Sequence, residues 1–386
     1  MNPLDAQVAQ SLRALADDIG FDPEDLALVR ARAAEASRRT RRRNVWSVLV
    51  ASGIAAVAIV TLTRGDGRTG DEPVGPVPTS PTPTQTGVRE VADPFTVLRT
   101  VAASRIGLDK VLKVAVSPDG HVYVTDVGEH VTELSADGAV ITRWGGAGTS
   151  PGRFRLYSGA VTVGPDGKVY VADTGNFRIQ VFSSGGRFLA QYGGYGQGPG
   201  RFVWPSDIVV AADGTMYVAD DRAATVTALT PSGQQIWRHG TPGETDPRWI
   251  GHEHLGGVTP QGQLVTANDD DGRVLFVDPD GRVADSFSTN EAGAGVDARG
   301  IPGGHFPNGT CGAKLDAQGD VYVSSCEESY APRHDTAVYD PRHRLVAGWE
   351  RGDLVDPPVF GPDGRAWAVT SGNKGLVELA VHLPGS

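Results

Sequence analysis

The feature that most constrains this 386-residue chain is a repeat that begins after about residue 93. A turn made of Asp-Gly or Gln-Gly, preceded by a short apolar segment and followed by one of the Val-Tyr-Val kind, recurs six times. The turns are Asp119-Gly120, Asp166-Gly167, Asp213-Gly214, Gln261-Gly262, Gln318-Gly319 and Asp363-Gly364. Subtracting successive positions gives steps of 47, 47, 48, 57 and 45 residues. A period in this range with four strand-sized segments predicts the blades of a six-bladed, all-β propeller.

A second turn supports four strands in each unit. It follows the first by 18 or 19 residues in four of the units, at Asp137-Gly138, Gly185-Gly186, Ser232-Gly233 and Asp280-Gly281. Two hairpins per unit give strands a, b, c and d. The composition agrees, because 51 glycines and 26 prolines against 21% charged residues are typical of many short strands joined by turns.

The last unit is one strand short. Residues from Pro358 to Val381 have room for only three strands before the chain ends. The segment from Phe95 to Val101 alternates polar and apolar residues and lies before the first full repeat. We expect it to supply the missing strand d and so close the ring, which pairs edges that would otherwise be exposed.

An uncharged apolar stretch predicts a membrane span. Val45 to Thr63 is 19 residues long and follows an arginine cluster that ends at Arg43. At about 1.5 Å per residue, this length crosses a hydrocarbon core of roughly 30 Å. Because the arginines precede the span, positive-inside bias keeps the N-terminus cytoplasmic and predicts an extracellular C-terminal part.

The competing interpretation is a cleaved signal peptide. Ala56 and Ala58 form a weak small-residue cleavage site, but 44 residues before the apolar stretch are long for such a leader. A signal anchor is therefore favoured, with localisation in the cell membrane as a single-pass protein.

The sequence thus divides into four parts. Residues 1–44 form a helical, Arg-rich cytoplasmic segment, 45–63 the transmembrane helix, 64–92 a linker rich in Pro, Gly and Thr, and 93–386 the propeller. The prolines of the linker predict an extended, semi-rigid spacer. The net charge of −11 argues against a nucleic-acid partner, which would need a basic face.

The second unit closely resembles the NHL repeat. The resemblance is carried by Gly159 to Phe182, which reads GAVTVGPDGKVYVADTGNFRIQVF, and by the glycine-rich connections at 145–154 and 193–202. It is strong in the first three units and degenerate in the last three. The family resemblance implies a six-bladed propeller that binds ligands or proteins, as in exported sensor domains, while a minority of the family are metal-dependent lyases, lactonases or hydrolases.

The residue that ends strand b is polar in all six units. The series is Asp126, Asp173, Asp220, Asn268, Ser325 and Thr370. A ring of acidic ligands is one interpretation. All four residue types also hydrogen-bond nearby backbone N–H groups, so a structural role in the b–c turn is favoured.

Two insertions mark one face of blades 4 and 5, at about 287–307 and 326–336. Histidines and carboxylates gather there, and imidazole and carboxylate groups are suitable ligands for zinc or calcium. The candidate metal ligands are His252, His254, His305 and His334. Their spacing matches no defined metal motif, so whether the chain is an enzyme stays open, with a non-enzymatic role favoured.

The leading hypothesis is therefore a non-enzymatic propeller that binds a protein, peptide or cell-envelope ligand on its loop-rich face. The residues expected on that face are Tyr157, Trp204, Asp207, Glu253, Asp270, Glu327 and Glu328. The alternative is a metal-dependent lyase, lactonase or hydrolase with its site on blades 4 and 5.

A disulfide is predicted between Cys311 and Cys326. A two-residue loop at Gln318-Gly319 would place the two cysteines opposite each other, and an extracellular location would allow oxidation. A longer turn would shift the register and separate them.

Overall fold

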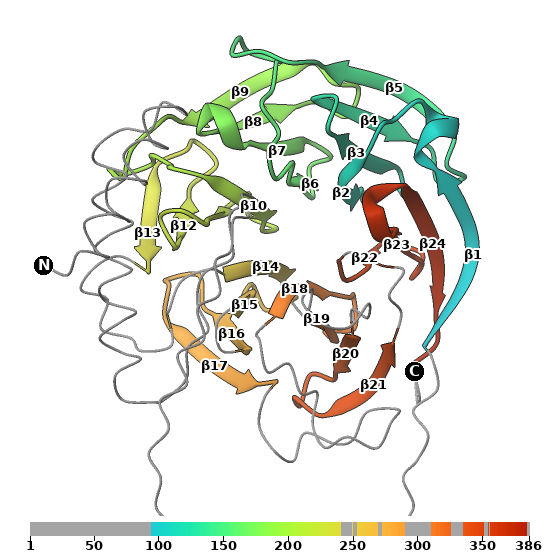
Figure 1. Cartoon of the computed structure of the whole chain (residues 1–386). Coiled ribbons are helices and arrows are strands. Elements are labelled where there is room, and N and C mark those ends of the chain that lie inside the picture. The colour runs from blue at the N-terminus through green and yellow to red at the C-terminus, as the bar shows by residue number, and fades with distance from the viewer. Residues whose placement is uncertain are drawn as a thin grey trace, which may run out of the picture. The chain divides into compact units, whose positions relative to one another are not determined.

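The structure is a computed structural model that describes residues 94–240, 249, 253–268, 272–289, 310–325, 335–350, 354 and 356–383. Six antiparallel sheets of four strands surround a common centre (Figure 1). In blades 1 to 5 the strands follow the chain from the inside outward, as a, b, c and d. The predicted six-bladed propeller is confirmed.

The strands of blades 1 to 3 are β2 (Val111–Val116), β3 (Val122–Asp126), β4 (His130–Leu134), β5 (Val140–Gly145), β6 (Val161–Val163), β7 (Val169–Asp173), β8 (Arg178–Phe182), β9 (Phe188–Gly193), β10 (Pro205–Val210), β11 (Met216–Asp220), β12 (Thr225–Leu229) and β13 (Gln235–His239). Those of blades 4 to 6 are β14 (Glu253–Val258), β15 (Leu264–Asn268), β16 (Arg273–Val277), β17 (Val283–Ser288), β18 (Thr310–Leu315), β19 (Val321–Ser325), β20 (Asp335–Tyr339), β21 (Leu345–Glu350), β22 (Val359–Phe360), β23 (Ala366–Val369), β24 (Gly375–Val381) and β1 (Phe95–Ala102). Within the described ranges there are three short 3₁₀ helices, η1 (Ala103–Ile106), η2 (Thr174–Asn176) and η3 (Ser371–Asn373).

Strand β1 closes the ring, as the sequence predicted. It pairs antiparallel with β24 and is the outermost strand of blade 6 (Figure 1). Arg99 lies opposite Glu378 in the register, and its Nη2 is 3.2 Å from the buried Glu378 Oε2. The first and last strands of the propeller are therefore joined by an antiparallel ladder, interrupted once between Val97 and Arg99, and by an ion pair.

The Val-Tyr-Val strands explain how the blades pack. In β7 the side chains of Val169 and Val171 belong to the apolar cluster shared with blade 1, whereas Tyr170 and Ala172 belong to the cluster shared with blade 3. Successive strand residues point to opposite faces of a sheet, and each central strand is buried on both. Alternating Val and Tyr thus fill the two interfaces on either side of one blade.

The turns have the conformation that their residues favour. Gly120 donates its N–H to Ser117 O over 2.9 Å and has a φ of 85°, a region open to glycine because it lacks a Cβ. The a–b and c–d turns lie at one end of the blades, which we call the turn face. The b–c loops and d–a connections lie at the other end, the loop face.

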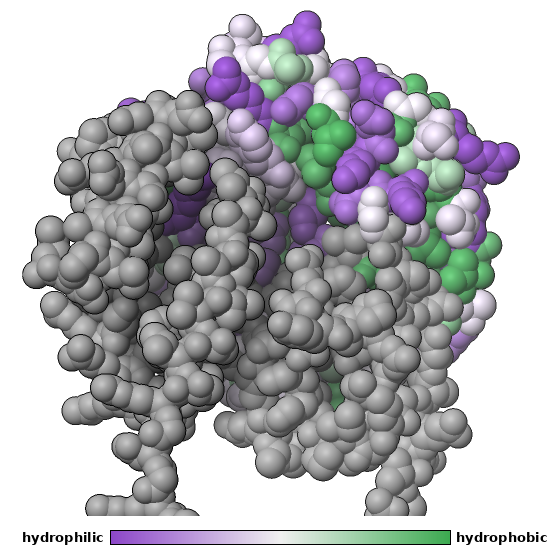
Figure 2. All heavy atoms as spheres, viewed as in Figure 1, coloured by the Kyte–Doolittle hydropathy of each residue, from purple (hydrophilic) through white to green (hydrophobic). Residues whose placement is uncertain are grey.

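The chain enters the propeller on the turn face. His382 N donates to Pro94 O over 2.7 Å, so the first described residue lies beside the end of β24, where the other blades have their c–d turns. The visible surface over blades 1, 2 and 6 interleaves hydrophilic and hydrophobic residues (Figure 2).

The predicted membrane span at 45–63 and the helical segment before it lie outside the described residues. Among the residues that the structure does describe, no helix is long and apolar enough to cross a membrane.

Candidate binding face

Two aromatic side chains project from neighbouring d–a connections on the loop face. Tyr157 precedes β6 and Trp204 precedes β10. Their rings are stacked, with centroids 5.1 Å apart and planes 24° apart. Tyr157 is 64% exposed, the largest exposed fraction among the exposed large hydrophobic side chains of the described part.

The backbone fixes Trp204 in place. Asp220 Oδ1 accepts a hydrogen bond from Trp204 N at 2.9 Å, and Trp204 O accepts one from Asp221 N at 3.2 Å. The b–c loop of blade 3 therefore holds the d–a connection that enters the same blade. The indole is presented by a fixed backbone rather than by a free loop.

A cation completes this cluster. The guanidinium carbon of Arg222, from the b–c loop of blade 3, lies 3.8 Å from the centroid of the Trp204 ring. A cation at this distance from an aromatic face is attracted by the ring quadrupole. We call Tyr157, Trp204 and Arg222 the aromatic cluster.

A second aromatic pair lies on the same face of blade 2. Phe177 in the b–c loop meets Tyr195 in the following d–a connection edge to face, with centroids 5.0 Å apart. Tyr195 is 53% exposed. The loop face of blades 2 and 3 thus offers two exposed aromatic rings, each supported by a second ring.

The channel of the propeller is polar and narrow. A cavity of about 40 Å³ is lined by apolar residues and by titratable residues from five blades, Lys113, Asp207, His254, Lys314 and Asp356. Since one water needs at least about 10–15 Å³ of such space, the cavity has room for a few waters.

The channel charges are largely paired within the protein. Lys113 Nζ lies 2.8 Å from Asp356 Oδ2. Burial opposes the charge on Lys113, but the Asp356 carboxylate, with smaller contributions from Asp207 and Asp221, outweighs the effect of burial, so the pKa of Lys113 is raised. Burial likewise opposes the charge on Asp356, and Lys113, with smaller contributions from Lys314 and His254, lowers its pKa.

The Asp207 carboxylate accepts two backbone hydrogen bonds. Its Oδ1 accepts from Ile208 N at 2.8 Å and its Oδ2 from Leu255 N at 3.1 Å, which ties blade 3 to blade 4. Lys314 Nζ donates to Leu255 O over 2.9 Å and ties blade 5 to blade 4. Both charged groups therefore hold neighbouring inner strands together.

Of the other predicted site residues, one is buried in its blade, one lines the channel, and the rest lie outside the described residues. Glu253 is 4% exposed, and its carboxylate accepts hydrogen bonds from Thr266 Oγ1 at 2.7 Å and Asn268 Nδ2 at 2.9 Å, so it points into the sheet. His254 lines the channel cavity. The residues that lie outside the described part are His252, Asp270, His305, Cys326, Glu327, Glu328 and His334.

The metal and disulfide predictions are thus untested. Among the described residues, no three His, Cys, Asp or Glu side chains are grouped as a metal site would require. Cys311 lies in β18, and its predicted partner is among the residues that the structure does not describe.

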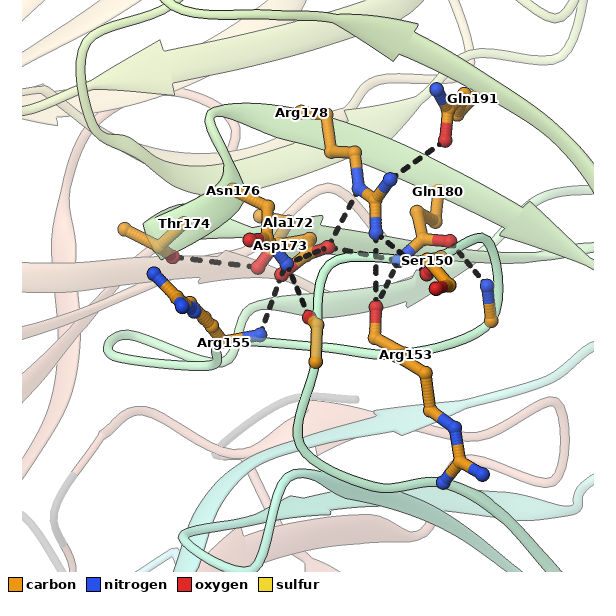
Figure 3. Close-up of polar contacts among 12 residues, drawn as sticks. Ser150, Arg153, Arg155, Ala172, Asp173, Thr174, Asn176, Arg178, Gln180 and Gln191 are labelled. Atoms are coloured by element: carbon orange, nitrogen blue, oxygen red, sulfur yellow. Dashed lines mark hydrogen bonds and ion pairs between the residues drawn. The ribbon is translucent and has the colours of Figure 1, made fainter.

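Two of the polar residues that end strand b, Asp173 and Asp220, have the structural role that the sequence favoured. Asp173 Oδ1 accepts from Arg155 N at 2.7 Å, and its Oδ2 receives Arg178 Nε and Gln180 Nε2, each at 2.8 Å (Figure 3). Asp220 accepts the N–H groups of Val203, Trp204 and Ala223. These carboxylates hold the d–a connection that enters their own blade.

An arginine donates hydrogen bonds to the backbone carbonyls of the same d–a connection. In blade 2, Arg178 on strand c donates from Nη2 to Ser150 O and Arg153 O, both at 3.0 Å (Figure 3). In blade 3 the donor is Arg238 on strand d, which reaches Gln197 O at 2.8 Å.

Blade 1 uses the arrangement of blade 3. Arg143 on strand d donates to Ile106 O at 2.7 Å and Gly107 O at 2.9 Å, and its Nε donates to Thr132 Oγ1. Arg238 donates in the same way to Thr227 Oγ1. In each of these three blades one arginine therefore holds the d–a connection, and it comes from strand c or from strand d. When the arginine comes from strand d, it also donates a hydrogen bond to a threonine on strand c.

Sequence reasoning missed Arg222, Lys314 and Asp356. Arg222 directly follows the Asp220-Asp221 pair at the end of strand b. This position places it on the loop face, and that was the sequence signal that could have identified it as a candidate binding residue. Nothing in the sequence indicates that Lys314 and Asp356 enter the channel, because neither lies in a repeated motif.

Comparisons with known proteins agree with the fold. The NHL repeat family model matches residues 159–182. No curated protein matches the sequence.

The solved structures that the chain resembles are distant in sequence. A catalytically inactive variant of virginiamycin B lyase from Staphylococcus aureus, with quinupristin, is 13% identical and has a TM-score of 0.47, covering 70% of this chain and 80% of that one. A streptogramin B lyase is 12% identical with a TM-score of 0.49, covering 75% and 98%. A protein of unknown function from Bacteroides caccae is 15% identical with a TM-score of 0.45, covering 62% and 81%.

Proposed function

We propose that this chain is a membrane-tethered extracellular binding protein. Its propeller holds a protein, peptide or cell-envelope ligand on the loop face and carries out no chemistry on it. The observation that carries the proposal is the aromatic cluster, in which the 64% exposed Tyr157 stacks on Trp204 beside Arg222.

The composition of the cluster favours recognition. Tyr, Trp and Arg are the residues that most often dominate binding energy, and they do so when a ligand covers them and excludes water. Tyr157 has no such cover within the described part of the protein. The stacking on Trp204 pre-orients the ring, which lowers the entropy that binding must overcome.

The rest of the loop face supports a surface site rather than a deep pocket. The channel cavity of about 40 Å³ is far smaller than the pockets that enclose small organic ligands, which hold several hundred Å³. Lys113 and Asp356 neutralise each other there. A ligand therefore lies across the loops.

Retention on the purified propeller tests this proposal. Residues 88–386 are immobilised and exposed to a cell-envelope fraction. We expect a component that is retained by the wild-type chain, lost when Tyr157→Ser and Arg222→Ser are combined, and kept by Ile236→Ser. Ile236 is the control because it is 48% exposed on β13, at the rim of blade 3. Equal retention by all three proteins would contradict the proposal.

A metal-dependent lyase, lactonase or hydrolase is the second candidate. The observation in its favour is that His254 shares the channel cavity with Asp207 and Asp356. Lys113 and Lys314 line the same cavity and oppose a cation there. Elemental analysis decides between the two: stoichiometric zinc or calcium that disappears in His254→Ala would favour the enzyme.

A further inference from the structure

We propose that the ligand of the loop face is an anionic carbohydrate, a proposal that rests on the binding function given above. Its sugar ring stacks on Tyr157, and its carboxylate or phosphate group pairs with Arg155. Three observations carry this assignment: the place of Arg155 beside Tyr157, the fixed backbone beneath both residues, and a guanidinium that the described part of the protein leaves without a partner.

Arg155 and Tyr157 lie side by side on the d–a connection that enters blade 2. Both contact the 3₁₀ helix η2, where a Cβ built on Gly175 would lie 2.5 Å from Tyr157 Cε2 and 2.8 Å from Arg155 Cβ. Both distances are too short for a contact between two carbon atoms, so the absence of a side chain at Gly175 allows this close approach. The aromatic ring and the arginine stem therefore have one common support.

The backbone of Arg155 is held at both of its polar groups. Its N–H donates to Asp173 Oδ1 over 2.7 Å (Figure 3). Its carbonyl accepts hydrogen bonds from Gly175 N at 2.9 Å and from Tyr157 N at 3.3 Å. A ligand that binds here therefore orders little backbone, which lowers the entropy that binding must overcome.

A buried hydroxyl joins the two connections that carry the stacked rings. Thr174 Oγ1 lies 2.7 Å from Ser158 Oγ and donates to Pro205 O over 2.9 Å. Ser158 directly follows Tyr157, and Pro205 directly follows Trp204. The rings of Tyr157 and Trp204 are therefore held in place together, as a platform that spans two blades.

The Arg155 guanidinium is available to a ligand. It is exposed, it makes no hydrogen bond or ion pair with the residues that the structure describes, and it points away from the network around Asp173 (Figure 3). The carboxylates that contact this connection are already occupied, because Asp173 pairs with Arg178 at 2.8 Å and Glu129 accepts a hydrogen bond from Leu156 N. An anionic group of the ligand can therefore replace water at Arg155.

An aromatic face beside a guanidinium selects the class of ligand. A sugar ring has a face of C–H groups with slight positive charge, which pack on the electron-rich face of Tyr157. A carboxylate or phosphate at the edge of the sugar accepts paired hydrogen bonds from the guanidinium. Arg155 and Arg222 would repel a cationic ligand, so the sugar must be neutral or anionic, and Arg155 favours the anionic one.

Two other anionic polymers suit the platform less well. A single-stranded nucleic acid needs a groove of positive charge that follows its backbone, whereas this chain has a net charge of −11. A peptide of Asp and Glu residues could pair with Arg155 but offers no ring and no C–H face to Tyr157. A carbohydrate uses both residues at once.

Calorimetric titration of the full chain in detergent tests the ligand class. The probes are a tetrasaccharide of galacturonic acid and its methyl ester, which has the same rings without the charge. We expect saturable binding of the acid and at least about ten-fold weaker binding of the ester, because the charge-assisted hydrogen bonds to Arg155 are lost. Equal affinities for acid and ester would overturn the proposal.

A third probe distinguishes the two sources of negative charge. It is an oligosaccharide joined by phosphodiesters, since a guanidinium pairs with phosphate as well as with carboxylate. Tighter binding of the galacturonate would assign the site to acidic sugars, and tighter binding of the phosphodiester would assign it to sugar phosphates. If neither shows saturable binding up to about 10 mM, the ligand is not an anionic carbohydrate.

Matched variants show whether the probe occupies this platform. Arg155→Gln should weaken the acid by about ten-fold and abolish the difference between acid and ester, an effect that a merely structural role would not produce. Tyr157→Ser should weaken acid and ester alike. Arg187→Gln, an exposed arginine on the turn face, and Ile236→Ser, on the rim, should change neither affinity. Equal effects of Arg155→Gln and Arg187→Gln would also count against the assignment.

Hexaglutamate and oligothymidylate separate this proposal from the binding function on which it rests. If either binds more tightly than the saccharides and is weakened by Arg155→Gln and Tyr157→Ser, the carbohydrate is the wrong ligand but the loop face still binds. Failure of the binding function itself has a different signature, because the wild type and the combined Tyr157→Ser and Arg222→Ser variant would then retain the same cell-envelope components.

Discussion

The ring of Tyr157 stacks on the ring of Trp204 across two d–a connections, with centroids 5.1 Å apart, while 64% of Tyr157 stays exposed. Each residue comes from a different blade, so the spacing between blades sets the distance between the rings. The pair is a product of the propeller rather than of one loop.

Replacing the exposed ring should affect binding far more than folding. Tyr157→Ser removes one aromatic stacking contact and little buried area, so we expect the free energy of unfolding to fall by about 1 kcal/mol or less. Urea unfolding followed by circular dichroism measures this. A loss of several kcal/mol would show that the ring is a structural support.

Arg178, which holds the d–a connection of blade 2, should be far more important for stability than Tyr157. Arg178 is 9% exposed and pairs at 2.8 Å with the fully buried Asp173. Arg178→Met leaves that carboxylate without its charge partner, so the free energy of unfolding should fall by about 3–5 kcal/mol. Arg187→Met, on the exposed c–d turn of the same blade, is the control and should change it by about 0.5 kcal/mol or less. Similar losses in both variants would contradict the role given to Arg178.

Ring closure by β1 predicts a sharp boundary for truncation. A chain that begins at residue 88 retains β1 and should fold as a soluble propeller. A chain that begins at residue 104 loses β1, exposes the edge of β24 and leaves Glu378 with Arg365 but without Arg99 as an ion-pair partner. We expect the shorter chain to aggregate, and size-exclusion chromatography measures the difference. A monomeric chain from residue 104 would show that closure is dispensable.

The a–b turn of blade 5 should make stability depend on pH. Burial, and then the neighbouring Asp316 and Asp340, raise the pKa of Asp320 from 3.8 to about 6. The folded state therefore binds this proton more tightly than the unfolded chain does. The contribution of Asp320 is most favourable below about pH 4, declines as the pH rises to about 6, and stays unfavourable above it.

Asp320→Asn tests that dependence. The change should raise the midpoint of thermal unfolding at about pH 7.5, where Asp320 is charged, and have little effect at about pH 4, where it is protonated in the folded state. Asp363→Asn, at the equivalent exposed a–b turn of blade 6, is the control. An equal effect of Asp320→Asn at both pH values would refute the assignment.

Much of the fold could be predicted because each repeat is marked by turn and strand residues that are close together in the sequence. The Asp119-Gly120 turn and its equivalents give the blade count, and alternating Val and Tyr fill two interfaces at once. The missing strand of the last unit identified Phe95 to Val101 as its partner, since an unpaired edge is unfavourable.

The details of the site could not be predicted to the same degree. Arg178 and Arg238 hold equivalent connections from different strands, so no fixed sequence position marks the role. Glu253 was expected on the ligand face, but its first place on β14 directs it toward Thr266 and Asn268 inside the sheet. Arg222 contacts Trp204 because the conformations of two loops bring them together, and the repeat pattern of the sequence does not predict these conformations.

The most direct test of the central claim is photocrosslinking from the loop face of the full chain in its native membrane. A photoreactive phenylalanine derivative is placed at position 157 in one protein and at 236 in another. We expect a discrete adduct with a cell-envelope component from position 157 and none from rim position 236, where Ile236 is also exposed, at 48%. No adduct from position 157, or the same adduct from both positions, would contradict it.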